Sequence, residues 1–113
     1  MISATLYCMN GEWTGFRAEG HSGYAEEGSD IVCAAVSVLG CTCVNSLEKL
    51  LGITVVMREN EEGLLDFDLP EIQDEKHGSA QLLMGALHQG LSDIRESYPE
   101  YLKIKIEGRR KKR

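Results

Sequence analysis

The first twenty residues alternate between apolar and polar positions, which predicts two strands, over residues 2 to 9 and 13 to 20. Such alternation is typical of a strand with one buried face. Asn10-Gly11 lies between the two segments and predicts a tight hairpin turn, because both residues accept a positive φ. The side chains that the alternation directs toward the core are Ile2, Ala4, Leu6, Cys8, Phe16 and Ala18.

A long apolar segment predicts a helix from about Asp30 to Leu51. Ser29 or Asp30 fits its N-cap, because a short side-chain oxygen accepts a hydrogen bond from an unpaired helix N–H group, and Gly52 fits its end. The segment is apolar nearly all round. We therefore expect it to be buried on most sides, either within the domain or against a partner chain. Its small and polar stripe consists of Cys33, Ser37 and Gly40.

The second half of the chain predicts another hairpin, a helix and a final strand. Residues 53 to 57 are β-branched and apolar, and an acidic turn over 59 to 63 joins them to a partner strand that ends at Pro70. The polar stretch from 71 to 78 is expected to be a linker or a frayed helix start. Three- and four-residue spacing then defines one helix face, made of Ala80, Leu83, Met84, Leu87, Leu91, Ile94 and Tyr98. The final strand is expected to turn Leu102, Ile104 and Ile106 inward.

The predicted element order is ββαββαβ, which favours an α+β fold. Hairpins indicate a mainly antiparallel sheet, and the two helices are expected to cover it. Residues 1 to 107 then form a single domain, and residues 108 to 113 form a basic C-terminal tail.

Composition agrees with one ordinary globular domain. The 113 residues are 42 % hydrophobic and 27 % charged, which is typical of globular proteins. We find no run of about 18 apolar residues that predicts a membrane span, and the first residues lack the basic region of a signal peptide. We therefore expect a cytoplasmic protein with no membrane partner.

The charge is unevenly distributed. Residues 109 to 113 hold five of the twelve basic residues. The rest of the chain has seven basic and 18 acidic residues, so its formal charge is −11. An acidic body argues against a broad nucleic-acid-binding face. The tail could contact RNA or another acidic surface, although terminal charge runs are more often solvated.

The four cysteines predict neither a disulfide framework nor a metal site. Cys41 and Cys43 would point about 200° apart on one helix, so they can neither pair nor bind one ion together. A redox sensor would need a resolving cysteine near Cys33, and Cys41 lies about 12 Å along the helix, too far for a bridge. Because no ligand pairs show metal-site spacing either, we expect no metal and no other cofactor.

His21 and Cys33 are the candidate chemical groups. His21 ends the second strand, Cys33 lies in the first turn of the first helix, and the loop between them contains Gly23 and Gly28. A thiolate is the nucleophilic form of cysteine, a helix N-terminus favours an anion, and an imidazole can take the thiol proton. Backbone N–H groups near Cys33 are expected to stabilise an oxyanion. The alternative is a buried cysteine that behaves as a small hydrophobic residue.

Two neighbours have two interpretations each. Ser37 lies one turn past Cys33, where its hydroxyl could hydrogen-bond a thiolate or a substrate group, or bond back to the Cys33 carbonyl. Asp30 may be read as a helix cap, as a group that orients His21, or as both. Its negative charge would favour an imidazolium and disfavour a thiolate.

The same stretch resembles a known family. The segments Gly20-His21-Ser22-Gly23-Tyr24 and Gly28-Ser29-Asp30-Ile31-Val32-Cys33-Ala34-Ala35-Val36-Ser37 are similar to the ribosomal-processing cysteine protease family, Prp, and the resemblance extends over residues 1 to 107. It implies a cytoplasmic endopeptidase, usually a homodimer. Its substrate would be the N-terminal peptide of a large-subunit ribosomal protein precursor, from which it removes a short extension.

The resemblance also implies roles for individual residues. His21 and Cys33 correspond to the catalytic pair, and Gly20, Asp30 and Ser37 to supporting positions. The loop that includes Ser22, Gly23, Tyr24, Gly28 and Ser29 would be mobile and ordered by substrate. The apolar first helix and the basic tail leave one alternative, a non-enzymatic ribosome-associated binding module.

Overall fold

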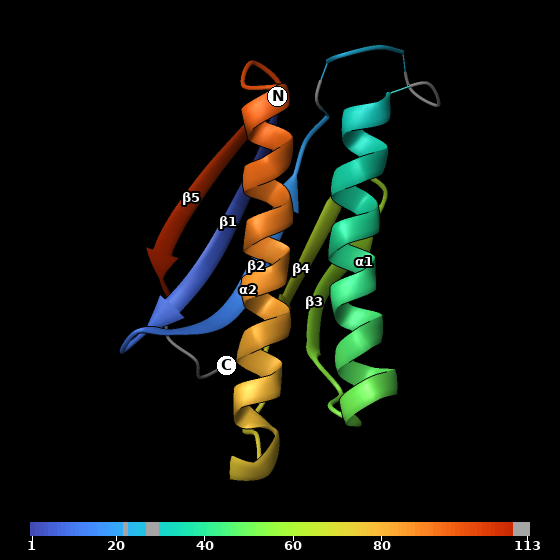
Figure 1. The fold of residues 1–113 in the computed structure, drawn as a ribbon. Coiled ribbons are helices and arrows are strands. Elements are labelled where there is room, and N and C mark those ends of the chain that lie inside the picture. The colour runs from blue at the N-terminus through green and yellow to red at the C-terminus, as the bar shows by residue number, and fades with distance from the viewer. Residues whose placement is uncertain (22, 27–29, 110–113) are drawn as a thin grey trace.

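The computed structural model describes residues 1–21, 23–26 and 30–109, which form a five-stranded sheet and two helices (Figure 1). The observed order ββαββαβ confirms the predicted α+β class. The elements are β1 (Ile2–Met9), β2 (Glu12–Glu19), α1 (Ile31–Leu51), β3 (Val56–Glu61), β4 (Leu64–Asp68), α2 (Asp74–Ser97) and β5 (Leu102–Gly108).

The sheet has the order β3-β4-β2-β1-β5, and β2 is its central strand. The pairs β1–β2, β2–β4 and β3–β4 are antiparallel, while β1 and β5 are parallel. Both helices lie side by side on one face of the sheet (Figure 1). Phe16 of β2 pairs with Phe67 of β4, and their ring centroids are 6.0 Å apart in the core under the helices.

The first hairpin confirms the predicted turn at Asn10-Gly11, and the second corrects the predicted bounds of its first strand. Asn10 and Gly11 adopt φ of 54° and 80° in the β1–β2 turn. The second strand pair was predicted with a strand over 53 to 57 and a turn over 59 to 63, but β3 begins at Val56 and runs through Glu61. Acidic residues fit there because β3 is an edge strand whose side chains are mostly exposed.

The ends of α1 confirm both predicted caps. Asp30 is the N-cap, with φ of −81°, and Gly52 is the C-cap in the left-handed conformation, with φ of 68°. Burial on most sides within the domain, however, is wrong, because Val38 is 62 % and Leu50 is 73 % exposed. The buried side of α1 lies against the sheet and α2. It comprises Val32, Val36, Gly40, Cys43, Val44 and Leu47. Burial against a partner chain stays a prediction.

Helix α1 also corrects the expectation about membrane spans. Over an 18-residue window its hydropathy of 1.7 makes it long and apolar enough to cross a membrane, by length and composition alone. A window average tolerates polar interruptions such as Thr42 and Asn45, which a search for an unbroken apolar run does not. Core helices of globular proteins pass the same test, and the buried face of α1 is part of the hydrophobic core.

Helix α2 and β5 confirm most of the predicted inward positions. Ala80, Met84, Leu87 and Leu91 are buried, and Leu102 is buried at the start of β5. Ile106 was expected to point inward but is 53 % exposed. The reason is that β5 is an edge strand, and its C-terminal half turns away from α2 (Figure 1).

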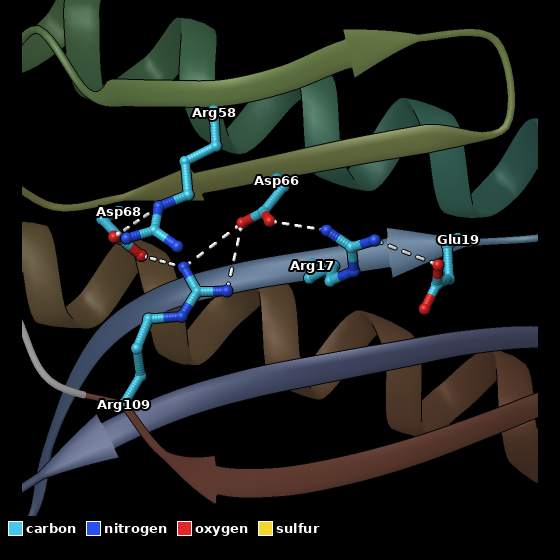
Figure 2. A network of polar contacts seen from close by, with 6 residues as sticks. All are labelled: Arg17, Glu19, Arg58, Asp66, Asp68 and Arg109. Carbon is cyan, nitrogen blue, oxygen red and sulfur yellow. Dashed lines mark hydrogen bonds and ion pairs between the residues drawn. The ribbon is translucent and has the colours of Figure 1, made fainter. Parts of the chain in front are cut away.

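The sheet face opposite the helices carries a network of ion pairs (Figure 2). Asp66 and Asp68 alternate with the core residue Phe67 and are only 3 % and 1 % exposed. Arg17 lies 2.7 Å from Asp66, Arg58 lies 3.2 Å from Asp68, and Arg109 contacts both carboxylates. Each buried carboxylate is therefore paired with at least two guanidinium groups.

Arg109 is the first residue of the basic run, and it packs against the body of the protein. Its guanidinium carbon lies 3.5 Å from the centroid of the Tyr7 ring. Burial acts to lower the pKa of Arg109, but hydrogen bonds with Tyr7 and Asp68 outweigh it and raise the pKa. Arg109 thus stays charged within the network. The rest of the run, residues 110 to 113, lies outside the described residues.

Candidate active site

A cavity of about 480 Å³ opens between the N-terminal half of α1, the end of β2 and the β3–β4 hairpin. His21 and Cys33, the two candidate chemical groups, both line it. They come from different elements, since His21 follows β2 and Cys33 lies in the first turn of α1. The fold therefore places an imidazole and a thiol, twelve residues apart in the sequence, at the wall of one cavity.

The cavity has an apolar floor and an acidic rim. Its apolar lining includes Ile2, Phe16, Ala18, Val36, Leu64 and Leu65. Glu19, Glu61 and Glu62 line it from β2 and the β3–β4 hairpin, and none of its described lining residues is a lysine or an arginine. Such a rim favours a peptide with apolar side chains directed inward and basic groups near the opening.

Helical spacing presents a stripe of small and polar side chains to the cavity. Cys33 is partly buried, and Ser37 and Cys41 follow it at intervals of four residues, both exposed. Gly40 has another role, because a Cβ there would lie 2.7 Å from the Leu65 side chain. The glycine lets Leu65 of β4 approach α1 closely.

Asp30 acts as a helix cap, and this corrects the predicted oxyanion site. One oxygen of the buried Asp30 carboxylate accepts hydrogen bonds from the N–H groups of Val32 and Cys33, both at 3.0 Å. The Ala34 N–H donates to the Asp30 carbonyl at 3.1 Å. These first-turn donors are already used, so the expectation that they bind an oxyanion is wrong. The cap satisfies N–H groups that a substrate would otherwise need.

Two of the predicted supporting residues, Ser37 and Gly20, also line the cavity. Ser37 lines the cavity one turn past Cys33. Among the described residues, a bond from a helical serine back to the carbonyl four residues earlier is made by Ser92 to His88, at 2.9 Å, and not by Ser37. Gly20 has φ of 97°, and a Cβ there would lie 2.8 Å from the Met1 carbonyl oxygen. Its contribution is thus a backbone turn that no other residue fits without strain.

The loop between His21 and Cys33 is described in part. Ser22, Gly28 and Ser29 of the predicted mobile loop lie outside the described residues. Gly23 has φ of 78° and lines the cavity. Tyr24 packs edge-on against Tyr98 and Tyr101, with centroid distances of 5.5 and 5.2 Å. This contact connects the loop to the end of α2 and the start of β5.

The four cysteines form no disulfide with one another and lie in distinct surroundings. Cys43 is buried between the helices, 3.7 Å from the Met84 sulfur, and burial raises its pKa to about 12. Cys41 is exposed and lines the cavity two turns after Cys33. In the part of the chain that the structure describes, no group of three or more histidine, cysteine or acidic side chains could hold a metal ion.

The cavity also contains residues that the sequence analysis missed. The turn at Glu62 and Gly63 lies beside His21, and the Gly63 carbonyl accepts a hydrogen bond from the Gly20 N–H at 3.0 Å. The acidic segment predicted a turn, but only the pairing of β4 with β2 brings that turn to the cavity. A thiol, an imidazole and an adjoining apolar hollow together suit nucleophilic attack on a bound peptide.

Comparisons with known proteins give a consistent result. A family model described as "Cysteine protease Prp" matches residues 1–103. The ribosomal processing cysteine protease Prp of Bacillus subtilis (strain 168) is 33 % identical over 107 residues, covering 92 % of this chain and 96 % of that protein.

Two solved structures are similar over nearly the whole chain. SMU.848 from Streptococcus mutans has a TM-score of 0.81 and 36 % identity over 96 % of each chain. The essential ribosomal processing protease Prp from S. aureus, in complex with a covalently linked product peptide, has a TM-score of 0.84 and 25 % identity. That match covers 94 % of this chain and 99 % of the other.

Proposed function

The chain belongs to the cysteine protease Prp family, and we propose that it is an endopeptidase that removes a short N-terminal extension from a large-subunit ribosomal protein precursor. Cleavage would support ribosome assembly. The observation that carries the proposal is the cavity that His21 and Cys33 share. The name of the Bacillus subtilis relative specifies ribosomal processing, and the S. aureus relative holds a covalently linked product peptide.

In the proposed reaction Cys33 is the nucleophile and His21 is the general base. The imidazole takes the thiol proton, and the sulfur attacks the scissile carbonyl carbon. The tetrahedral intermediate then breaks its C–N bond, and the imidazolium gives the proton to the leaving amine. Water, deprotonated by His21, attacks the thioester, which releases the carboxylic acid and restores the thiol.

Two electrostatic effects of opposite sign act on Cys33 at the start of α1. The positive end of the helix dipole lies at its first turn and favours a negative sulfur. The Asp30 carboxylate acts in the opposite sense, since it is bonded to the Cys33 N–H. Because the cap uses the first-turn N–H groups, the proposed oxyanion partners are other groups that line the cavity, with the Ser37 hydroxyl as the donor one turn from the sulfur.

The proposed state is a cytoplasmic homodimer. The outer face of α1 supports it, because Ile31 and Val38 lie on one side of the helix and are at least half exposed, and exposed apolar patches favour association. Val38→Glu is expected to halve the mass measured by light scattering after gel filtration. Lys103→Glu, at an exposed polar position of β5, is the control that should keep the larger mass.

Cleavage of the precursor tests the enzyme assignment. The protein is incubated with the full-length ribosomal precursor, and the mass of the product is measured. We expect a shortened product with the wild-type protein and with Cys41→Ser, a second thiol of the same cavity, and an intact precursor with Cys33→Ser. Full cleavage by Cys33→Ser contradicts the proposal. An intact precursor after incubation with the wild-type protein would favour a non-enzymatic ribosome-associated module instead.

A further inference from the structure

The turn between β3 and β4 packs directly against His21. Gly63 is the second residue of this turn, and a Cβ built on it would lie 3.2 Å from His21 Nε2 and 3.4 Å from His21 Cε1. The nitrogen edge of the imidazole thus lies over the Gly63 backbone. His21 is exposed, and within the described part of the chain this turn limits where the ring can lie on one side.

The position of the turn is itself fixed. The Gly20 N–H donates to the Gly63 carbonyl at 3.0 Å, which ties the turn to the residue before His21. The next residue, Leu64, pairs with Glu19 at the end of β2. Gly63 has φ of 79°, a region that L side chains rarely adopt. Both the backbone conformation and the space beside the ring therefore favour glycine at position 63.

We propose that Gly63 is a positioning residue for His21: the bare backbone of the β3–β4 turn holds the imidazole at the mouth of the cavity, within the catalytic arrangement. This inference rests on the proposed function, in which His21 moves the proton. It assigns a role to a hairpin that contributes no nucleophile, acid or base. A side chain at position 63 would displace the ring by a few tenths of an ångström.

The other hairpin of the protein provides a matched control. Gly11 in the β1–β2 turn has φ of 80°, nearly the same as the 79° of Gly63, but a Cβ there would meet nothing within 4 Å. Asparagine tolerates this backbone region better than other non-glycine residues. Gly63→Asn and Gly11→Asn therefore carry the same backbone change, and only the first places a Cβ against His21. Gly63→Ala and Gly11→Ala repeat the comparison with a smaller side chain.

The experiment measures kcat and KM for precursor cleavage across the neutral pH range, together with the thermal melting of each variant. We expect Gly63→Asn to lower kcat about tenfold or more and to displace the pH profile, with KM changed less than about twofold, because the proton-transfer group is misaligned. Gly11→Asn is expected to keep the wild-type kcat. A purely structural role would lower the melting temperature of both variants and leave kcat per folded molecule unchanged.

Wild-type kcat in both Gly63 variants, or an equal loss in the Gly63 and Gly11 pairs, overturns the inference. Cys33→Ser is measured in the same assay so that the two proposals fail separately. If Cys33→Ser cleaves like the wild-type protein, the proposed function fails, and the role of Gly63 fails with it. If Cys33→Ser is inactive while Gly63→Asn is fully active, only the role of Gly63 is overturned.

Discussion

Strand β4 separates two buried regions of opposite chemistry. Leu65 and Phe67 face the helices, and Leu65 lines the cavity, whereas Asp66 and Asp68 face the ion-pair network (Figure 2). Phe67 is 0 % exposed and Asp68 is 1 % exposed, so the two sides are buried equally well. Apolar contacts are non-directional and can surround a hollow, but a buried carboxylate is stable only while its partners remain. The candidate pair His21 and Cys33 lies on the first side, and the second side is expected to hold the sheet together.

Removing the imidazole tests the cavity side of this comparison. His21→Ala is expected to lower kcat/KM for precursor cleavage about a thousandfold, which is the usual contribution of a general base. Since His21 is exposed, its loss should leave the melting temperature nearly unchanged. Mass spectrometry of the product and a thermal melt measure the two quantities. His88→Ala, remote from the cavity lining, is the control that should keep full activity.

Removing a carboxylate tests the network side and should have the opposite pattern. Asp68→Ala removes the carboxylate that pairs with Arg58 and leaves Arg109 with Asp66 alone, and it is expected to cost about 3 to 5 kcal/mol of unfolding free energy. Activity per folded molecule should change less than about twofold. Urea unfolding measures the cost, and Asp93→Ala, at an exposed carboxylate, should cost less than about 0.5 kcal/mol. An equally small cost at both positions would show that the network does not stabilise the sheet.

The end of the chain gives a smaller effect on the same side. Arg109→Ala removes a guanidinium that bonds both carboxylates and stacks on Tyr7, and about 1.5 to 3 kcal/mol of stability should be lost. Lys105→Ala is the control, because its pair with Glu107 at 3.8 Å is exposed and such pairs contribute little. Equal costs for the two substitutions in urea unfolding would contradict an anchoring role for Arg109.

Local signals in the sequence predict elements and the candidate pair, but they do not predict sheet pairing. Asp30 and Gly52 mark the ends of α1 because caps act within a few residues. His21 and Cys33 are recognisable because a strand end, a loop and a helix start adjoin in the chain. Gly63 is not recognisable as a neighbour of His21 from the sequence. Their contact depends on the pairing of β4 with β2, and α1 and β3 separate these two strands in the chain.

Edges and ends of the sheet account for the remaining differences. The alternation of Ile106 with Lys105 predicts an inward side chain at position 106. However, β5 is an edge strand, and only part of its apolar face is covered. The polar residues of β3 form a strand because hydrogen bonds to β4 replace the apolar alternation. Arg109 belongs to a charge run that alone predicts a solvated tail. Its partners Asp66 and Asp68 are 43 and 41 residues earlier in the chain, beyond any local pattern.

Cys43 provides the smallest expected effect, on the helix side away from the cavity. Burial raises the pKa of Cys43 from 9.0 to about 12, so the folded protein keeps its thiol proton at a pH where the unfolded chain loses it. The stability that this proton provides is complete below about pH 9 and is lost as the pH rises toward 12. Unfolding free energy should fall by about 0.8 kcal/mol between pH 8 and pH 9.5. Cys43→Ala should remove that part of the pH dependence, and Cys41→Ser, at an exposed thiol, should retain it. Iodoacetamide labelling gives an independent measurement. At pH 8 Cys43 should stay unlabelled in the folded protein, while Cys33 should react fastest. Labelling of Cys43 at the rate of Cys41 would contradict its burial between the helices.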